Sequence, residues 1–249
     1  FDGIDSTYVK ATKLPTTTFH ISYNRSWEAN YRKAQTGAGA KINSLSVPKQ
    51  LLKSQATFHL SPMEPSKAVK LVNYIKKNSN DAAVSVSTWI GYIGQNKQRR
   101  ILRKLATQVD FFMLNECEAK ALTETNYLPF AIDKIKTPKL IVTMGKLGAI
   151  ISGDDNEPQM IPGLSVPKGN VIDTTGAGDT WNGAFLATFI KTRDLMKSVT
   201  AASIMSSIKC SAWGFEAIEN LRFKKPSDLV EYVMALREGR MQKKISDYK

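Results

Sequence analysis

One glycine-rich segment of the chain combines an acidic side chain with the backbone features of an anion site. Residues 171–185 read VIDTTGAGDTWNGAF, in which Gly176, Ala177 and Gly178 come directly before Asp179 and an expected helix. Such small residues let backbone N–H groups approach a ligand closely, and the start of a helix adds partial positive charge. This combination is typical of a site for a phosphate or a transferring phosphoryl group. The same dipole is expected to keep Asp179 ionised, so that it can accept a hydroxyl proton.

The residue types also exclude other chemistries. Two cysteines, Cys117 and Cys210, and two separate histidines, His20 and His59, are too few for a zinc cluster. The chain has no GxxxxGK[ST] phosphate loop. The glycines at 176–178 lack the third glycine and the downstream acidic residue of a dinucleotide site, which argues against an oxidoreductase.

Composition restricts the class of protein further. The 249 residues suffice for one large domain, and 42% hydrophobic with 23% charged residues is ordinary for a globular protein. No run approaches the roughly 18–20 apolar residues of a membrane helix, so no membrane partner is expected. Two cysteines cannot form a disulfide framework, which favours a reducing compartment, the cytoplasm.

The net charge is +13, from 35 Lys and Arg against 22 Asp and Glu. Such a balance is compatible with a polyanionic partner, so a basic nucleic-acid-binding protein is one alternative function. The basic residues are spread along the chain, however, and the two denser stretches, 97–104 and 237–244, do not alternate with aromatic residues. A solvated basic surface is therefore favoured, and no nucleic acid is expected as a partner.

Buried-type strands alternate with helical patterns over most of the chain. This rhythm predicts an α/β fold with a mostly parallel sheet covered on both faces. The predicted strands are 56–60, 82–86, 110–114, 139–143 and a strand that begins at 148–151. The predicted helices are one from Pro65, then 98–107, 116–122 with Asn115 as N-cap, 179–191, 195–212 and 226–236.

A hairpin near the start does not belong to that rhythm. Residues 16–23 and 29–35 are strand candidates joined by a polar turn, and the flexible loop GAGA follows at 37–40. We expect a small appended sheet here.

Three motifs in order resemble those of the ribokinase-like (PfkB) carbohydrate kinase family. DTTGAGD at 173–179 is similar to the family's C-terminal signature, NECE at 115–118 to its N-x-x-E motif, and TMGKLG at 143–148 to its nucleotide-binding turn. Taken singly, NECE is a helix cap and TMGKLG a hairpin turn. The resemblance covers essentially the whole chain and implies a three-layer α/β/α domain, 1–249, with a β lid at 12–40.

The resemblance implies an ATP-dependent kinase that transfers the γ-phosphate to a hydroxyl of a sugar or related small molecule. Asp179 would be the general base, and the N–H groups of residues 176–178 would form the anion hole. Glu118 would hold Mg²⁺ through water. The residues implied to line the nucleotide are Asn115, Thr143, Gly145, Gly148 and Gly214.

Asp173 and Thr175 match positions that bind a monovalent cation in many relatives, which implies possible activation by K⁺; the alternative is that Asp173 only orders the turn. The resemblance also implies that about fifty residues before Phe1, which would carry much of the substrate contact, are missing. Nucleotide and substrate functions would then be separable along the sequence. A homodimer through the lid is a further possibility that the resemblance opens.

Two departures from the family pattern bear on the substrate. The chain has Gly37-Ala38-Gly39 where many sugar kinases have Gly-Ala-Asn, and Ser87-Thr88-Trp89 where many have Asp-Pro-Asn. Both weaken a simple ribokinase or fructokinase assignment. A nucleoside kinase of the same fold is therefore an open alternative, as is a non-catalytic nucleotide-binding protein.

Overall fold

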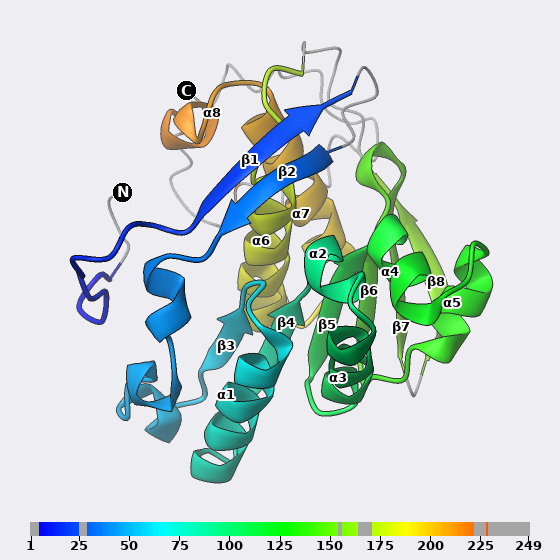
Figure 1. Cartoon of the computed structure of the whole chain (residues 1–249). Coiled ribbons are helices and arrows are strands. Elements are labelled where there is room, and N and C mark those ends of the chain that lie inside the picture. Colours follow the sequence, from blue (N-terminus) through cyan, green and yellow to red (C-terminus); the bar gives the residue numbers. More distant parts are fainter. Residues whose placement is uncertain (1–4, 25–28, 154–155, 164–170, 222–227, 229–249) are drawn as a thin grey trace.

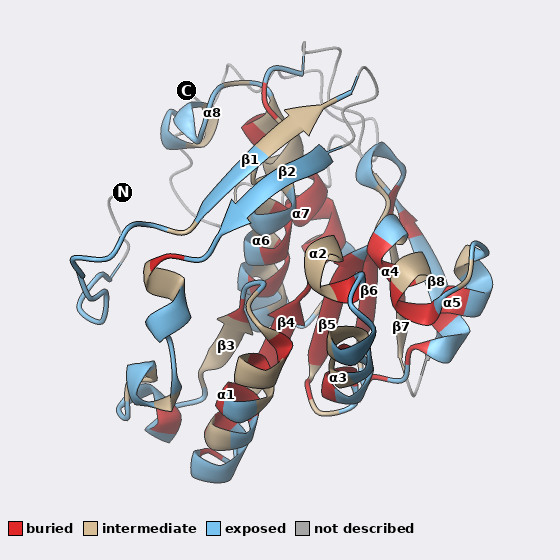
Figure 2. Ribbon diagram, viewed as in Figure 1, coloured by how far each residue is buried: buried red, intermediate tan, exposed pale blue. Residues whose placement is uncertain are grey.

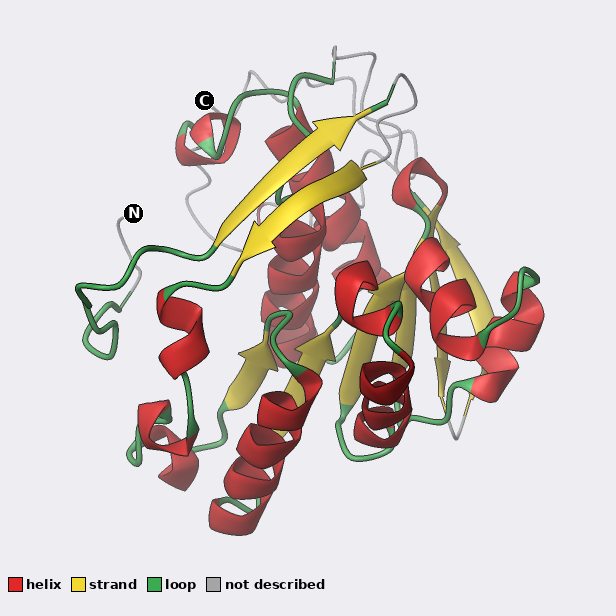
Figure 3. Ribbon diagram, viewed as in Figure 1, coloured by secondary structure: helices red, strands yellow, loops and turns green. Residues whose placement is uncertain are grey.

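The computed structural model describes residues 5–24, 29–153, 156–163, 171–221 and 228. These residues form three layers, in which a six-stranded sheet lies between two sets of helices and a separate two-stranded hairpin crosses above one end of the sheet (Figures 1 and 3). The α/β class and the mostly parallel sheet that the alternation predicts are both confirmed.

The strands of the main sheet follow one another in chain order. Hydrogen-bonded neighbours run β3-β4-β5-β6-β7-β8; the pairs from β3 to β6 are parallel and the last two are antiparallel. The carboxyl ends of β3 to β6 therefore meet at one edge of the sheet. The strands are β3 (Thr57–Leu60), β4 (Ala83–Ser87), β5 (Phe111–Asn115), β6 (Leu140–Thr143), β7 (Gly148–Gly153) and β8 (Asn156–Pro162).

Side chains alternate across β5 and divide the core into two halves. Phe112 and Leu114 belong to the cluster beneath the helices on one face, whereas Phe111 and Met113 pack with α6 and α7 on the other. Figure 2 shows buried residues along the strands and on the helix faces turned toward them. Both faces of the sheet are thus covered, which is why its strands read as continuous apolar runs. The helices are α1 (Pro65–Asn78), α2 (Ile90–Ile93), α3 (Asn96–Ala106), α4 (Glu116–Thr123), α5 (Leu128–Lys134), α6 (Ala177–Thr192), α7 (Leu195–Cys210) and α8 (Glu216–Glu219).

The predicted hairpin forms a sheet of its own. Strands β1 (Thr18–Tyr23) and β2 (Ala29–Gln35) pair antiparallel, with an irregularity between His20 and Ile21. The residues of β2 are largely exposed and belong to neither core cluster, although the ring of Tyr31, 38% exposed, packs against Trp89. In Figure 1 the hairpin extends over the edge where the parallel strands end.

Several details differ from the sequence predictions. The loop expected at GAGA is a 3₁₀ helix, Ala38–Lys41, because Gly37 packs against the backbone of Pro15 and Ala38 N–H donates to the Pro15 carbonyl at 2.8 Å. Strand β8 and the short helices α2 and α5 lack a clear periodic pattern and were not predicted. The helix expected at 226–236 lies outside the described residues. Within the described part of the chain, no helix is both long and apolar enough to cross a membrane.

Phe185 is the central aromatic side chain of the core beneath α6. It is fully buried and stacks between Trp181 and Phe189, with centroid distances of 5.4 and 6.0 Å. We expect Phe185→Ala to lower the free energy of unfolding by about 3–5 kcal/mol, because the change removes buried area and leaves a cavity. Phe130→Ala on α5, where the ring is 61% exposed, is the control and should cost much less. Urea unfolding of both variants measures the difference, and equal losses would contradict this view of the core.

Candidate active site

Two predicted nucleotide-binding residues lie side by side at the carboxyl edge of the sheet. The parallel register of β5 and β6 places Asn115 opposite Thr143, each as the last residue of its strand. In open α/β sheets ligands bind beyond this edge. The register thus positions both side chains where the sequence motifs predict a nucleotide.

Asn115 and Glu118 form a reciprocal cap at the start of α4. The Asn115 side chain accepts the Glu118 N–H at 2.9 Å, and Glu118 Oε2 accepts the Asn115 N–H at 3.0 Å. The N-cap predicted for Asn115 is confirmed, and the NECE segment has a structural role of its own.

Glu118 is also a buried carboxyl. Burial raises its pKa to about 7, although hydrogen bonds from Asn115 and from Thr88 Oγ1, at 3.3 Å, act in the opposite direction. Its side chain is thus partly protonated at neutral pH, and a nearby divalent cation would favour the ionised form. Among the described residues no three acidic, histidine or cysteine side chains come together as a metal cage.

The glycine turn has the backbone geometry of an anion site. Gly176 is the N-cap of α6 and adopts φ +78°, a left-handed conformation that favours glycine. The Ala177 N–H is already engaged with the Thr174 carbonyl at 3.1 Å. Within the described residues, the N–H groups of Gly176 and Gly178 have no acceptor, and a side chain at Gly178 would meet only open space. Of the three N–H groups expected to form an anion hole, those of Gly176 and Gly178 are thus the two left without an acceptor in the described part of the chain.

Asp179 lies in the first turn of α6, directly after these N–H groups. The side chain is accessible, yet the protein around it removes enough water to raise its pKa above the ordinary value. This effect opposes the helix dipole, which alone was expected to stabilise the ionised form. A carboxylate of raised pKa is a stronger proton acceptor, which suits a general base.

Asp173 is fixed by contacts on its carboxylate and its carbonyl. Its Oδ1 accepts the Thr175 N–H at 2.9 Å, and its Oδ2 accepts the Lys209 ammonium at 2.6 Å and the Gly214 N–H at 3.3 Å. Burial raises the pKa of Asp173, but the hydrogen bonds from Lys209 and Thr175 and the Lys209 charge outweigh it and lower the pKa to about 2. Lys209 was not among the predicted residues, because its only signal in the sequence is a lysine on an otherwise small and apolar stretch of helix.

The three remaining predicted glycines differ in their surroundings. Gly145 and Gly214 have positive φ and open space beside them, and Gly214 is tied to the Asp173 turn. Gly148 is buried, and a Cβ there would clash with the Ile161 carbonyl oxygen. Gly148 thus serves the close approach of β7 and β8.

The hairpin contacts the anion turn directly. The Tyr23 hydroxyl and Thr175 Oγ1 are 2.9 Å apart, and they join residues 152 positions apart in the chain. Burial raises the pKa of Tyr31 on β2, as do the negative charges of Glu118 and Asp179. Both carboxylates are therefore within electrostatic reach of the hairpin, which closes over the site.

The carboxylate of Asp179 lies beside two backbone N–H groups that have no acceptor in the described part of the chain, at the ligand-binding edge of an α/β sheet. This arrangement is the one expected of a site that transfers phosphoryl groups. The comparisons with known proteins give this class a family. The model of the pfkB family of carbohydrate kinases matches residues 2–218, so the chain belongs to that family of phosphotransferases, which act on hydroxyl groups.

Three similar proteins illustrate the relationship. The chain is 25% identical to the cytidine kinase of Thermococcus kodakarensis over 81% of this chain and 72% of that protein. A nucleoside kinase of Burkholderia thailandensis solved with inosine superposes with a TM-score of 0.63 at 18% identity, over 81% of this chain and 64% of that one. A fructokinase of Vibrio cholerae solved with fructose, ADP and calcium superposes with a TM-score of 0.62 at 19% identity. The match covers 80% of this chain and 70% of the fructokinase. The ribokinase-like fold is confirmed, and the chain spans about two thirds of the length of these proteins.

The Tyr23–Thr175 hydrogen bond yields a test of the hairpin's role. We expect Tyr23→Phe to lower kcat/KM about 2- to 10-fold, because one neutral hydrogen bond contributes about 0.5–1.5 kcal/mol. Tyr127→Phe, on an exposed ring of another surface, is the matched control. Steady-state kinetics with ATP and the best acceptor measure the effect. Unchanged kinetics in Tyr23→Phe would show that closure does not use this contact.

Proposed function

We propose that this protein is an ATP-dependent kinase that transfers the γ-phosphate to a hydroxyl of a sugar or a nucleoside. The observation that carries the proposal is Asp179 in the first turn of α6, beside the N–H groups of Gly176 and Gly178. Production of ADP with a panel of sugars and nucleosides tests it. A panel that yields no acceptor, from protein that binds ATP, would instead support the non-catalytic alternative.

The residues divide the chemistry between them. The Asp179 carboxylate takes the proton from the acceptor hydroxyl as its oxygen attacks the γ-phosphorus and the bond to ADP breaks. The N–H groups of Gly176 and Gly178 stabilise the charge that spreads over the phosphoryl oxygens. Because these groups are fixed by the turn and the helix, they need no reorganisation during transfer.

Glu118 fits a magnesium ion held mainly by water and ATP phosphates. Its carboxyl is buried and anchored by Asn115, Thr88 and the backbone of Ile90, which fixes its position. Mg²⁺ prefers oxygen ligands and retains several waters, so one protein carboxylate suffices. When bound, the ion would offset charge on the triphosphate.

The nucleotide base has a candidate platform beside the anion turn. Trp213 and Phe215 flank Gly214 and are 71% and 43% exposed, and a Cβ at Gly176 would lie 4.0 Å from the Phe215 ring. Exposed aromatic rings this close to the phosphate site suit stacking on adenine. Thr143 and Gly145, at the neighbouring strand end, complete the proposed nucleotide site.

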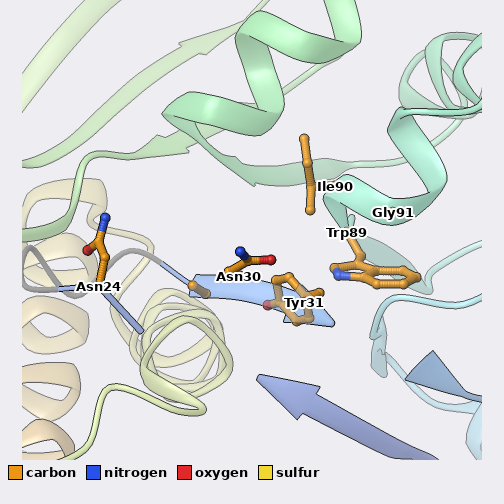
Figure 4. A pocket seen from close by; sticks show the side chains of 7 residues that line it. Asn24, Asn30, Tyr31, Trp89, Ile90 and Gly91 are labelled. Carbon is orange, nitrogen blue, oxygen red and sulfur yellow. The ribbon is translucent and has the colours of Figure 1, made fainter. Parts of the chain in front are cut away.

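The acceptor has a candidate site between the hairpin and the start of α2. A cleft of about 600 Å³ lies between β2 and the start of α2. Figure 4 shows the rings of Tyr31 and Trp89 next to each other in its lining. Their centroids are 5.5 Å apart at 73°. Gly91 leaves room for the indole, since a Cβ there would clash with the ring. Trp89 Nε1 is buried with no acceptor among the described residues, so it can donate to a ligand.

This aromatic cleft favours a nucleoside over a free sugar. A nucleobase offers a flat face for the Tyr31 and Trp89 rings, whereas a small sugar leaves most of the cleft empty. Two of the similar proteins named above are a cytidine kinase and a nucleoside kinase. The homodimer through the lid, the single domain over 1–249 and the cytoplasmic location remain predictions of the sequence.

The role of Asp179 is tested by Asp179→Asn. We expect kcat to fall at least about 100-fold while ATP binding changes little, because the amide keeps the size but cannot accept the proton. Asp133→Asn, at a side chain that is 84% exposed, is the control. Turnover and ATP calorimetry on both variants decide. Near wild-type turnover in Asp179→Asn would remove this residue from the role of base.

The two aromatic sites predict opposite kinetic phenotypes. We expect Trp89→Ala to raise KM for a nucleoside about tenfold or more with little change for ATP, since stacking on a base contributes about 1–3 kcal/mol. Trp213→Ala should instead raise KM for ATP. Initial rates with each substrate varied in turn separate the two sites. A Trp89→Ala enzyme with an unchanged nucleoside KM would place the acceptor elsewhere.

A further inference from the structure

The turn before the anion site holds a buried ammonium. Lys209, in the last turn of α7, is 1% exposed, and its Nζ contacts both Asp173 Oδ2 at 2.6 Å and the Asp173 carbonyl at 2.9 Å. The backbone reinforces the contact, because the N–H groups of Ile172 and Asp173 donate to the Cys210 carbonyl at 2.8 and 3.3 Å. The end of α7 and the turn are thus one unit.

This arrangement does not fit the monovalent cation that the family resemblance implied. Such an ion would need the Asp173 oxygens, and each of them already accepts a hydrogen bond from Lys209, Thr175 or Gly214. A second positive charge beside a buried ammonium would also be repelled strongly, since little water screens the pair. The ammonium and a potassium ion therefore compete for one place.

We propose that Lys209 is a built-in cation that replaces potassium at this turn and positions the anion hole. Its charge neutralises Asp173, so that no bare carboxylate faces the phosphoryl group three residues further along. Its two contacts fix the backbone that leads into Gly176, whose N–H group faces the anion. Lys209 touches neither reactant and acts through Asp173, so it is a positioning residue. The expected effect of Lys209 on the rate of phosphoryl transfer rests on the proposed kinase function; its occupancy of the cation site does not.

The unmodified protein provides the first test. Crystals soaked in thallium(I), a potassium mimic with strong anomalous scattering, should show no ion at Asp173, and K⁺ should not raise the Tm relative to tetramethylammonium at equal ionic strength. Phosphoryl transfer should proceed at the same rate, within about twofold, in both salts. Thallium bound to Asp173, or a several-fold activation by K⁺, would overturn the proposal.

Removing the ammonium provides the second test. In Lys209→Ala we expect kcat to fall at least about tenfold in tetramethylammonium chloride with little change in KM for ATP. We expect K⁺ or methylammonium to restore part of the rate and to raise the Tm, because either cation can enter the vacated place. Lys197→Met, which removes a half-buried lysine of the same helix with its ion pair to Asp194, should behave as the wild type in every salt.

The outcomes distinguish this proposal from the function on which it rests. Wild-type rates for Lys209→Ala in all salts, or losses that no small cation restores, would contradict a role as a cation. If Lys209→Ala does not fold, the thallium and Tm measurements on the wild type still decide. If no acceptor is phosphorylated, the proposed function fails, but those two measurements still report whether Lys209 occupies the cation site.

Discussion

The buried pair of Asp173 and Lys209 is the contact on which the geometry of the site depends. It joins the end of α7 to the turn from which α6 starts, and α6 and α7 together cover one face of the sheet. A buried pair of this kind is stable only when its remaining hydrogen-bonding groups are satisfied. The N–H groups of Thr175 and Gly214 meet that requirement, so the pair also orders the loops on both sides of it.

The sheet contributes the second constraint, which is register. Parallel pairing brings the carboxyl ends of β5 and β6 level, so Asn115 and Thr143 face the same space without any contact between their side chains being needed. The reciprocal cap with Glu118 then starts α4 directly after the strand. The same residues thus satisfy the helix end and line the proposed nucleotide site, which explains why NECE reads equally well as a cap and as a functional motif.

The sequence predicted those parts of the structure in which local pattern and tertiary environment agree. Short, β-branched apolar runs such as 139–143 favour strands buried on both faces. The glycine turn before Asp179 allows the positive φ that Gly176 adopts. Strand β8 escaped prediction because its polar sequence, NEPQMIP, is held by pairing with β7 rather than by burial of its own side chains. Contacts between residues far apart in the chain could be predicted even less well from the sequence. Lys209 and Tyr23 reach this turn across 36 and 152 positions of the chain, so no local pattern could connect them to it.

The turn that leads into α6 contacts both the hairpin and the core helix α7. Asp173 is bound by Lys209 of α7, and two residues later Thr175 contacts Tyr23 of the hairpin. Any movement of the hairpin therefore acts on the segment whose N–H groups form the anion site. On the same hairpin, Tyr31 lines the proposed acceptor cleft, and the negative charges of Glu118 and Asp179 add to the burial that raises its pKa. If an acceptor binds in the proposed cleft, the hairpin links it to the anion turn, because Tyr31 lines that cleft and Tyr23 contacts Thr175.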